Sequence, residues 1–254
     1  MRKKLLAFDL DGTLTPPYKE VLVQHKKFFE NFIKSFDWKI AIITWSTLEK
    51  VEQQLLDYIS SDLFAKIYVS TCNGWVCYIF DYSLQERRPL WEYKFDEKDL
   101  NFLKSSLYEA RDQVLKEKIK PIWEDFVVKW WYMVSFSVIW KDAPDHLKEN
   151  RDPEWRKRKK LIEYLKEKFS QYEFYIWWRT AIDILPNWVN KWFVLEKLVD
   201  FEKINKKEVL FFGDWFVRWG NDWPVKEYWF DVVEVSWLEQ TFNFIKQILW
   251  NLRS

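Results

Sequence analysis

Residues 5–15 read LLAFDLDGTLT, in which four apolar residues lead directly into Asp9 and Asp11. A short apolar run bounded by a polar turn is typical of a buried β-strand, here residues 5–8. Two aspartates two positions apart repel each other when both are ionised, and a bound cation relieves that repulsion. In open α/β sheets, ligands bind at the carboxyl ends of the strands. The stretch therefore predicts a site in which one carboxylate attacks a phosphorus atom and the other transfers the leaving-group proton.

An alternative interpretation of this Asp-x-Asp-Gly-Thr run is a polar turn or a calcium-binding loop. A loop of the EF-hand type needs further oxygen ligands in the following positions and a glutamate at its twelfth position. Leu14, Pro16 and Pro17 occupy the following positions here, and Glu20 comes twelfth without the intermediate ligands. The catalytic interpretation is therefore preferred.

A second acidic segment follows the apolar run at residues 208–212, which is also predicted to be a strand. Gly213 and Asp214 come directly after it, and Asn221 and Asp222 follow a few residues later. Carboxylate oxygens are the hard ligands that Mg²⁺ prefers. A Gly-Asp pair alone is a common turn, but together with the first acidic pair it predicts a magnesium site.

Two further segments place polar side chains beside predicted strand and helix ends. Residues 40–46 read IAIITWS, so the hydroxyl groups of Thr44 and Ser46 follow a strand, where they can contact a ligand. The alternative is that Ser46 or Thr47 caps the next helix. Lys191 comes at the start of a predicted helix, where its ammonium group either balances phosphate and carboxylate charge or lies on the surface. The spacing alone leaves both alternatives open.

Strand-like and helix-like segments alternate in the first and last parts of the chain, which predicts an α/β fold with a Rossmann-like parallel sheet. The middle part instead combines two amphipathic helices with two strand-rich runs, which predicts an inserted α+β domain. The predicted boundaries are residues 1–84 and 187–254 for the α/β core and residues 85–186 for the insertion.

Composition argues against several classes of function. The formal charge of +1, with basic and acidic residues interleaved, gives no electrostatic argument for binding nucleic acid or a membrane surface. No stretch approaches the ~20 apolar residues of a membrane span, and Asp9 and Asp11 interrupt the first apolar run too early for a signal peptide. Cys72 and Cys77 are too few for a disulfide framework and fit a reducing compartment. We therefore expect a soluble, cytoplasmic protein.

Taken in order, residues 9–13, Thr44, Lys191 and the segment holding Asp214 and Asp222 resemble the four sequence motifs of the haloacid dehalogenase superfamily of phosphotransferases. The insertion between the second and third motifs resembles the type IIB cap of that superfamily. The resemblance implies that residue 9 is a nucleophile that becomes an aspartyl phosphate, with Asp11 as general acid and then general base. It also implies that Thr44 hydrogen-bonds the transferring phosphoryl group and that Lys191 neutralises it.

The same resemblance implies Mg²⁺ as the cofactor. Its ligands would be the side chains of Asp9, Asp214 and Asp222 together with the backbone carbonyl of Asp11. The resemblance also places a set of small and polar residues at the substrate, namely Gly12, Thr13, Ser46 and Asn221.

When Trp215 and Trp219 are replaced by glycine, residues 213–222 resemble phosphomannomutases and related bacterial type IIB hydrolases. The insertion is expected to select the substrate. Asp183 matches the mutase pattern, but Ala181 stands where the mutases have serine and Lys141 stands for an arginine. Tyr18 and Lys19 replace a further arginine near the first motif. Lysine and arginine are not equivalent at bidentate phosphate sites. The resemblance therefore implies a sugar phosphate substrate, with hydrolysis placed ahead of phosphomannomutase chemistry.

Three basic residues of the insertion, Lys129, Lys141 and Arg179, either form a floor for one anionic substrate or belong to an ordinary charged surface. A homodimer through the insertion is a further expectation. A third functional class is a non-catalytic sugar-binding or scaffold protein that uses exposed tryptophans. The complete set of acidic and lysine motif residues argues against that class.

Tryptophan is unusually frequent in this chain and glycine unusually rare. The 254 residues include 19 Trp and 4 Gly, whereas a chain of this length carries roughly 18 Gly at average usage. Trp188, Trp192 and Trp219 stand in turn-like segments, where tryptophan lacks easy access to the positive φ that glycine supplies. Our hypothesis is that most of these tryptophans are glycines whose UGA codons were translated with the wrong code, and the alternative is a Trp-rich protein.

Overall fold

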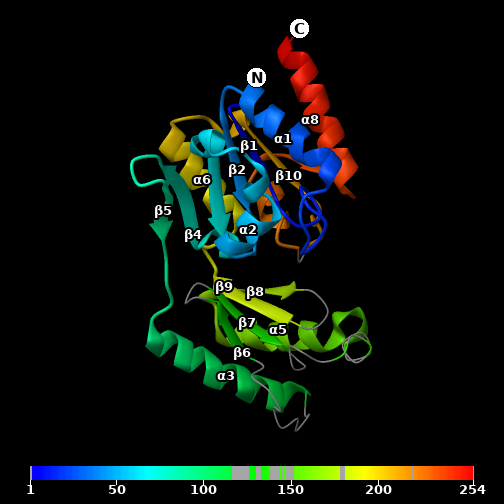
Figure 1. Cartoon of the computed structure of the whole chain (residues 1–254). Helices are drawn as coiled ribbons and strands as arrows, with labels where there is room; N and C mark the ends of the chain where they lie inside the picture. Colours follow the sequence, from blue (N-terminus) through cyan, green and yellow to red (C-terminus); the bar gives the residue numbers. More distant parts are fainter. Residues whose placement is uncertain are drawn as a thin grey trace. The chain divides into compact units, whose positions relative to one another are not determined.

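The computed structural model of the chain describes residues 2–115, 126–129, 133–137, 144, 146, 152–177, 181–218 and 220–253 (Figure 1). The chain forms two compact units. Met1–Glu92 and Asn190–Ser254 make up the first unit, and Tyr93–Val189 makes up the second. Each unit is built on a sheet of its own.

The first unit contains a seven-stranded sheet with the order β11-β10-β1-β2-β3-β4-β5. Strands β11 to β3 in this order run parallel, whereas β4 and β5 are antiparallel to their neighbours. The bounds are β1 Leu5–Phe8, β2 Lys39–Ile43, β3 Ile67–Thr71, β4 Val76–Asp81, β5 Glu86–Glu92, β10 Val209–Gly213 and β11 Asp231–Glu234. The predicted α/β fold with a largely parallel sheet is confirmed.

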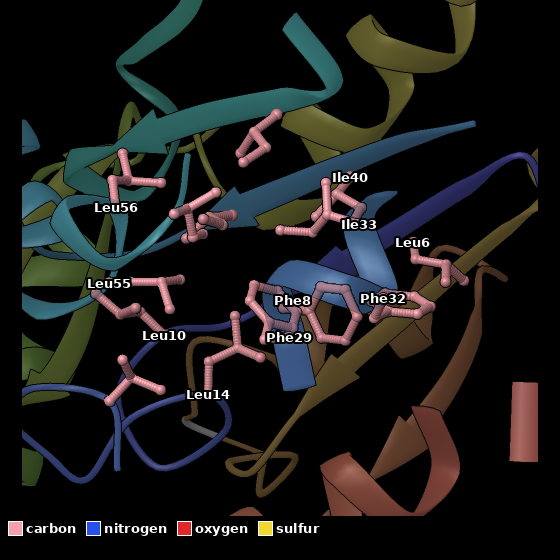
Figure 2. Close-up of a cluster of buried hydrophobic side chains, with 14 of the residues drawn as sticks. Leu6, Phe8, Leu10, Leu14, Phe29, Phe32, Ile33, Ile40, Leu55 and Leu56 are labelled. Atoms are coloured by element: carbon pink, nitrogen blue, oxygen red, sulfur yellow. The ribbon is translucent and has the colours of Figure 1, made fainter. Parts of the chain in front are cut away.

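Apolar clusters lie on both faces of this sheet, because successive residues of a strand point to opposite sides. Leu6 and Phe8 of β1 belong to the cluster in Figure 2, which also contains Phe29 of helix α1. Leu5 and Ala7 belong to a second cluster, which contains the apolar residues of α6. Burial on both faces explains why β1 reads as a continuous apolar run. The helices are α1 Val23–Ser35, α2 Leu48–Gln54, α6 Lys191–Glu202, α7 Trp223–Glu227 and α8 Leu238–Arg253, and the 3-10 helices are η1 Leu56–Tyr58, η2 Ser61–Lys66, η3 Cys72–Gly74 and η5 Lys206–Glu208.

The second unit contains a four-stranded antiparallel sheet with the order β6-β7-β9-β8. Helices α3 and α5 pack against each other, and α5 also contacts β8. The bounds are α3 Glu97–Leu115, β6 Phe126–Lys129, β7 Met133–Ser137, η4 Pro153–Trp155, α5 Arg156–Lys168, β8 Tyr172–Trp177 and β9 Ala181–Pro186. This combination of helices with an antiparallel sheet is the α+β architecture predicted for the insertion.

The hairpin of β4 and β5 extends the first unit past the boundary predicted after residue 84. β5 pairs with β4 from Glu86 to Glu92, so the whole hairpin belongs to the seven-stranded sheet. Most of β5 is exposed or half-buried, and it begins with three charged residues. An edge strand of this kind lacks the apolar run by which the other strands are recognised in the sequence.

A buried ion pair lies at the start of α5 in the second unit. Arg158 Nε is 2.7 Å from Asp152 Oδ2, and both side chains are fully buried. Asp152 also accepts hydrogen bonds from the backbone N–H groups of Lys157 and Arg158. Arg158 in turn donates to the carbonyl of Ala181, so the pair joins the start of α5 to the start of β9.

We expect Asp152→Ala to lower the free energy of unfolding by about 3–5 kcal/mol, because removal of one partner leaves the other charge buried and uncompensated. Lys166→Ala is a matched control, since Lys166 pairs with Glu173 where both side chains are partly exposed. An exposed pair of this kind contributes at most about 1 kcal/mol. Urea unfolding of the two variants measures the difference, and equal losses would contradict the expectation.

Two of the described tryptophans have the left-handed backbone that favours glycine. Trp155 has a φ of 61° and Trp229 has a φ of 67°. After α7, the Trp229 N–H donates to the carbonyl of Lys226, and the Phe230 N–H donates to the carbonyl of Val225. These are the two hydrogen bonds of a Schellman motif, in which the left-handed residue is most often glycine. Both positions have a backbone that glycine adopts more readily than tryptophan, and the hypothesis that tryptophan stands for glycine stays a prediction.

Trp229→Gly should raise the free energy of unfolding by about 0.5–1 kcal/mol. A left-handed backbone costs an L-residue about 1–2 kcal/mol, and the greater freedom of glycine in the unfolded chain offsets part of the gain. Trp250→Gly is the control, because Trp250 is similarly exposed (75% against 82%) but belongs to α8. Because glycine is unfavourable in a helix, Trp250→Gly should not raise the free energy of unfolding. Thermal unfolding measures both changes, and a loss of stability in Trp229→Gly would contradict the expectation.

Candidate active site

Carboxylates from three segments meet at the carboxyl edge of the seven-stranded sheet. Asp9 follows β1, and Asp214 follows β10, which lies beside β1 with Phe8 paired to Phe212. Asp222 directly precedes α7. One carboxylate oxygen of each aspartate lies within 4.8 Å of the other two. The fold therefore brings together the two acidic segments of the sequence, and these three aspartates are called the acidic group below.

The ammonium group of Lys191 lies inside the acidic group. Its Nζ is 2.9 Å from Asp9 Oδ1 and 2.7 Å from Asp222 Oδ1, and its side chain is fully buried. Asn190 caps α6 by accepting the N–H of Phe193, so Lys191 is the first residue of that helix. The burial of Lys191 excludes the surface alternative that the sequence had left open.

The acidic group carries more negative charge than Lys191 neutralises. Burial raises the pKa of Asp9 well above its usual range, with Lys191 opposing this effect and Asp222 and Asp214 adding to it. Burial and the charge of Asp222 raise the pKa of Asp214 to about 6. Burial alone would lower the pKa of Lys191, but Asp222 and Asp9 raise it. Excess negative charge and three converging oxygen donors suit a divalent cation such as Mg²⁺.

Ionisation of Asp214 should weaken the fold as pH rises from about 4 to about 6, because its folded pKa exceeds that of the unfolded chain. The pKa of Asp9 is raised as well, so its ionisation adds to this loss. Near pH 7.5, Mg²⁺ at roughly 100 times its dissociation constant should raise the free energy of unfolding by about 2–3 kcal/mol. Near pH 5 the gain should be much smaller, because protons compete for the same oxygens. Thermal unfolding with and without Mg²⁺ measures both gains. Asp214→Asn should reduce the stabilisation by Mg²⁺ near pH 7.5, and the same stabilisation as in the parent would contradict the assignment of Asp214 as a ligand.

Glycines allow the backbone to approach the acidic group closely. A Cβ atom at Gly12 would lie 2.3 Å from Asp214 Oδ2, and one at Gly213 would lie 2.5 Å from Asp222 Oδ2. Asp222 Oδ2 accepts the backbone N–H groups of Asp214 and Trp215, which fixes the carboxylate at this position. Gly12 was predicted to contact the substrate, and the structure shows that it also makes room for Asp214.

Two other predicted substrate-binding residues, Thr13 and Asn221, are buried. Thr13 Oγ1 and Asn221 Oδ1 have no hydrogen-bond partner within the described part of the protein. Buried polar atoms are normally hydrogen-bonded. Both atoms are therefore available to a ligand or an ordered water.

The hydroxyl groups predicted from residues 40–46 lie just after β2. Thr44 is buried, and its Oγ1 accepts the backbone N–H of Ser46. Ser46 Oγ donates to Asp11 Oδ2 at 3.4 Å. Helix α2 is preceded by Thr47, which makes no side-chain capping hydrogen bond. The structure thus shows no capping role for either Ser46 or Thr47, and Ser46 instead contacts a candidate catalytic carboxylate.

The carboxylate of Asp11 has its own set of partners, apart from the acidic group. Its Oδ1 accepts the Tyr18 N–H at 2.7 Å and Gln54 Nε2 at 3.1 Å. Because the acidic group does not include the side chain of Asp11, the predicted metal role of this residue rests on its backbone carbonyl. Sequence reasoning missed Gln54, because a single glutamine in a helix forms no recognisable motif.

The predicted substrate residues of the insertion are placed only in part. Asp183 is buried in β9, where it pairs with Ser135 of β7. Lys129 is the last residue of β6. Lys141 and Arg179 lie outside the described residues. The basic floor formed by the three cations therefore stays a prediction.

A family model described as haloacid dehalogenase-like hydrolase matches residues 6–222, which include β1 and the whole acidic group. The chain belongs to the haloacid dehalogenase-like hydrolases. The family resemblance seen in the sequence is confirmed, and the protein is an enzyme of this hydrolase family.

Relatives of this haloacid dehalogenase-like hydrolase include phosphomannomutases of two plants. The Solanum lycopersicum enzyme is 28% identical over 226 residues, which cover 87% of this chain and 83% of the relative. The Triticum aestivum enzyme is 28% identical over 229 residues, which cover 88% of this chain and 86% of the relative.

Solved structures show the same fold at lower sequence identity. Plasmodium falciparum IMP-nucleotidase has a TM-score of 0.72 at 17% identity, covering 97% of this chain and 69% of that chain. The protein 0175 of Thermoplasma acidophilum has a TM-score of 0.63 at 14% identity, covering 98% of this chain and 99% of that chain. At these identities the similarity establishes the haloacid dehalogenase-like fold.

Proposed function

We propose that this chain is a Mg²⁺-dependent phosphatase that hydrolyses sugar phosphates through a phosphoryl-Asp9 intermediate. The observation that carries the proposal is the burial of Lys191 between Asp9 and Asp222, inside the acidic group. Catalysis of phosphoryl transfer depends mainly on positioning and charge neutralisation. A nucleophilic carboxylate fixed against a buried ammonium group supplies both.

In the first step of the proposed reaction, an oxygen of Asp9 bonds to phosphorus while the bond from phosphorus to the sugar oxygen breaks. Lys191 balances the charge of the phosphoryl group, the Thr44 hydroxyl donates a hydrogen bond to it, and Asp11 gives its proton to the sugar oxygen. In the second step, Asp11 takes a proton from a water molecule whose oxygen displaces Asp9 from phosphorus. Inorganic phosphate is released and both carboxyl groups return to their first state.

Mg²⁺ would be held by the side chains of the acidic group and the backbone carbonyl of Asp11. When bound, it supplies additional positive charge at the phosphoryl oxygens. The three converging carboxylates support this assignment, because Lys191 supplies only one positive charge among them.

Phosphomannomutase activity is the second candidate, and the two plant relatives favour it. A mutase would pass the phosphoryl group from Asp9 to a second hydroxyl of the sugar instead of to water. Asp183 agrees with that activity, but Ala181 and Lys141 depart from the mutase pattern. A mutase must hold both phosphate-bearing ends of its intermediate, so these departures place hydrolysis first.

We infer that the inserted unit acts as the cap that selects a small sugar phosphate. A cytoplasmic location and a homodimer through this unit remain predictions. No helix in the described ranges is both long and apolar enough to span a membrane. The formal charge of +1 gives no electrostatic argument for binding nucleic acid, so the absence of such a partner also stays a prediction.

A ³¹P NMR time course distinguishes the two activities. The sample contains mannose 1-phosphate, Mg²⁺ and a trace of hexose 1,6-bisphosphate. The enzyme is the full chain with Trp45, Trp192 and Trp219 replaced by glycine, called the glycine-restored chain below. Growth of the inorganic phosphate signal is the expected result. Conversion to mannose 6-phosphate would establish the mutase instead, and unchanged signals with this and other sugar phosphates would contradict both activities.

A further inference from the structure

Gln54, the last residue of α2, joins that helix to the segment that follows the first motif. Its side chain is only 4% exposed. Nε2 donates to Asp11 Oδ1 at 3.1 Å and to the carbonyl of Lys19 at 3.2 Å. The backbone carbonyl of Gln54 accepts the N–H of Val21 at 2.8 Å. The glutamine is therefore fixed from both its side chain and its backbone.

Three donors surround the Asp11 carboxylate and set its orientation. The Tyr18 N–H and Gln54 Nε2 share Oδ1, while Ser46 Oγ approaches Oδ2 at 3.4 Å. Gln54 is the most buried of the three donor residues, since Tyr18 is exposed and Ser46 is half-buried. Asp11 stays outside the acidic group although it follows Asp9 by two positions. The contact with Gln54 is well suited to keep the two carboxylates in different roles.

We propose that Gln54 is a positioning residue that holds Asp11 in place for proton transfer to the leaving group. This inference rests on the proposed phosphoryl transfer to Asp9. A carboxamide donor suits both forms of Asp11 in that reaction, because an ionised carboxylate and the carbonyl oxygen of a protonated acid both accept hydrogen bonds. Nε2 can therefore keep its contact with Asp11 Oδ1 before and after the proton is transferred.

Proton transfer from Asp11 matters for some leaving groups and not for others. When the bond from phosphorus to a sugar oxygen breaks, that oxygen leaves as an unstable alkoxide unless it receives a proton from Asp11. When the leaving group is nitrophenolate, the aromatic ring spreads the negative charge and no proton is needed. Loss of Asp11 positioning should therefore slow the transfer from sugar phosphates to Asp9 and spare the transfer from p-nitrophenyl phosphate.

The test compares Gln54→Met with Gln53→Met in the glycine-restored chain. The ratio kcat/KM is measured with mannose 6-phosphate and with p-nitrophenyl phosphate, because it reports the steps up to phosphoryl transfer to Asp9. Gln54→Met should lower it by about 10–100-fold for the sugar phosphate, a part of the 10²–10⁴-fold that general acids contribute. For the aryl ester the change should stay below about threefold. Gln53→Met should leave both values unchanged, since Gln53 is exposed and contacts Lys50 and Glu49.

A second variant covers the case in which Gln54→Met does not fold. Gln54→Glu keeps the length of the side chain but removes the N–H donors, and the same selective loss is expected. An equal loss on both esters would show a merely structural role and overturn the assignment, and so would no loss on either. If the parent enzyme hydrolyses neither ester, the proposed function fails and this assignment fails with it.

Discussion

Asp9→Asn should reduce phosphate release by about 10⁴-fold or more, because the amide cannot attack phosphorus and loss of a nucleophile removes most of the catalytic effect. The fold should persist. Asp9 Oδ1 accepts the N–H of Leu10 at 2.8 Å, and the amide oxygen of asparagine can accept it as well. Lys191 also keeps its contact with Asp222. Phosphate release from a sugar phosphate, measured alongside thermal unfolding, separates lost chemistry from lost structure.

Asp231→Asn is the control for this substitution. Asp231 is a partly exposed carboxylate of β11 that pairs with Lys3 and Lys207, and it is not a member of the acidic group. The same chemical change there should leave turnover within about twofold of the parent, as expected for an exposed pair. Turnover by Asp9→Asn within about tenfold of the parent would contradict the assignment of Asp9 as the nucleophile.

The glycine-restored chain should release phosphate at least about 10²-fold faster than the chain with tryptophan, because a misplacement of catalytic groups by about 1 Å costs a factor of this size. Trp45 is buried between Thr44 and Ser46 in the chain. Trp192 directly follows Lys191, and its ring stacks on Tyr228 with centroids 3.9 Å apart. Each bulky ring thus adjoins a residue of the proposed catalytic machinery.

The third position of the glycine-restored chain, Trp219, lies outside the described residues. Its neighbour Gly220 is in a tight turn, where a Cβ atom would lie 2.1 Å from the carbonyl oxygen of Trp215. Parallel phosphate-release assays on the two chains measure the effect, with Trp250→Gly as a control that should not increase activity. Full activity in the tryptophan chain would contradict the expectation. UGG codons at Trp45, Trp177 and Trp219 would refute the hypothesis itself.

The sequence predicted most of the core because its strands are buried on both faces. The apolar runs before Asp9 and before Gly213 became the neighbouring strands β1 and β10. Apolar runs did not predict β5, because it is an edge strand with little buried surface.

The acidic residues of the site were recognisable because they belong to two short motifs, which follow the apolar runs of β1 and β10. The burial of Lys191 could not be predicted from the sequence, because burial is a property of the fold. In the sequence, a buried lysine and an exposed lysine at a helix start give the same pattern. Gln54 was missed for a related reason. Its role arises from contacts with Asp11 and Lys19, which are more than 30 residues away in the chain.

The most direct test of the account is to look for the phosphoryl group on the protein. The glycine-restored chain is mixed with mannose 6-phosphate and Mg²⁺, quenched in acid during turnover and digested for peptide mass spectrometry. The account predicts a phosphoryl group on Asp9 in the parent enzyme and none on this peptide in Asp9→Asn. Release of phosphate in the same quenched samples with no phosphoryl group on Asp9 would contradict it.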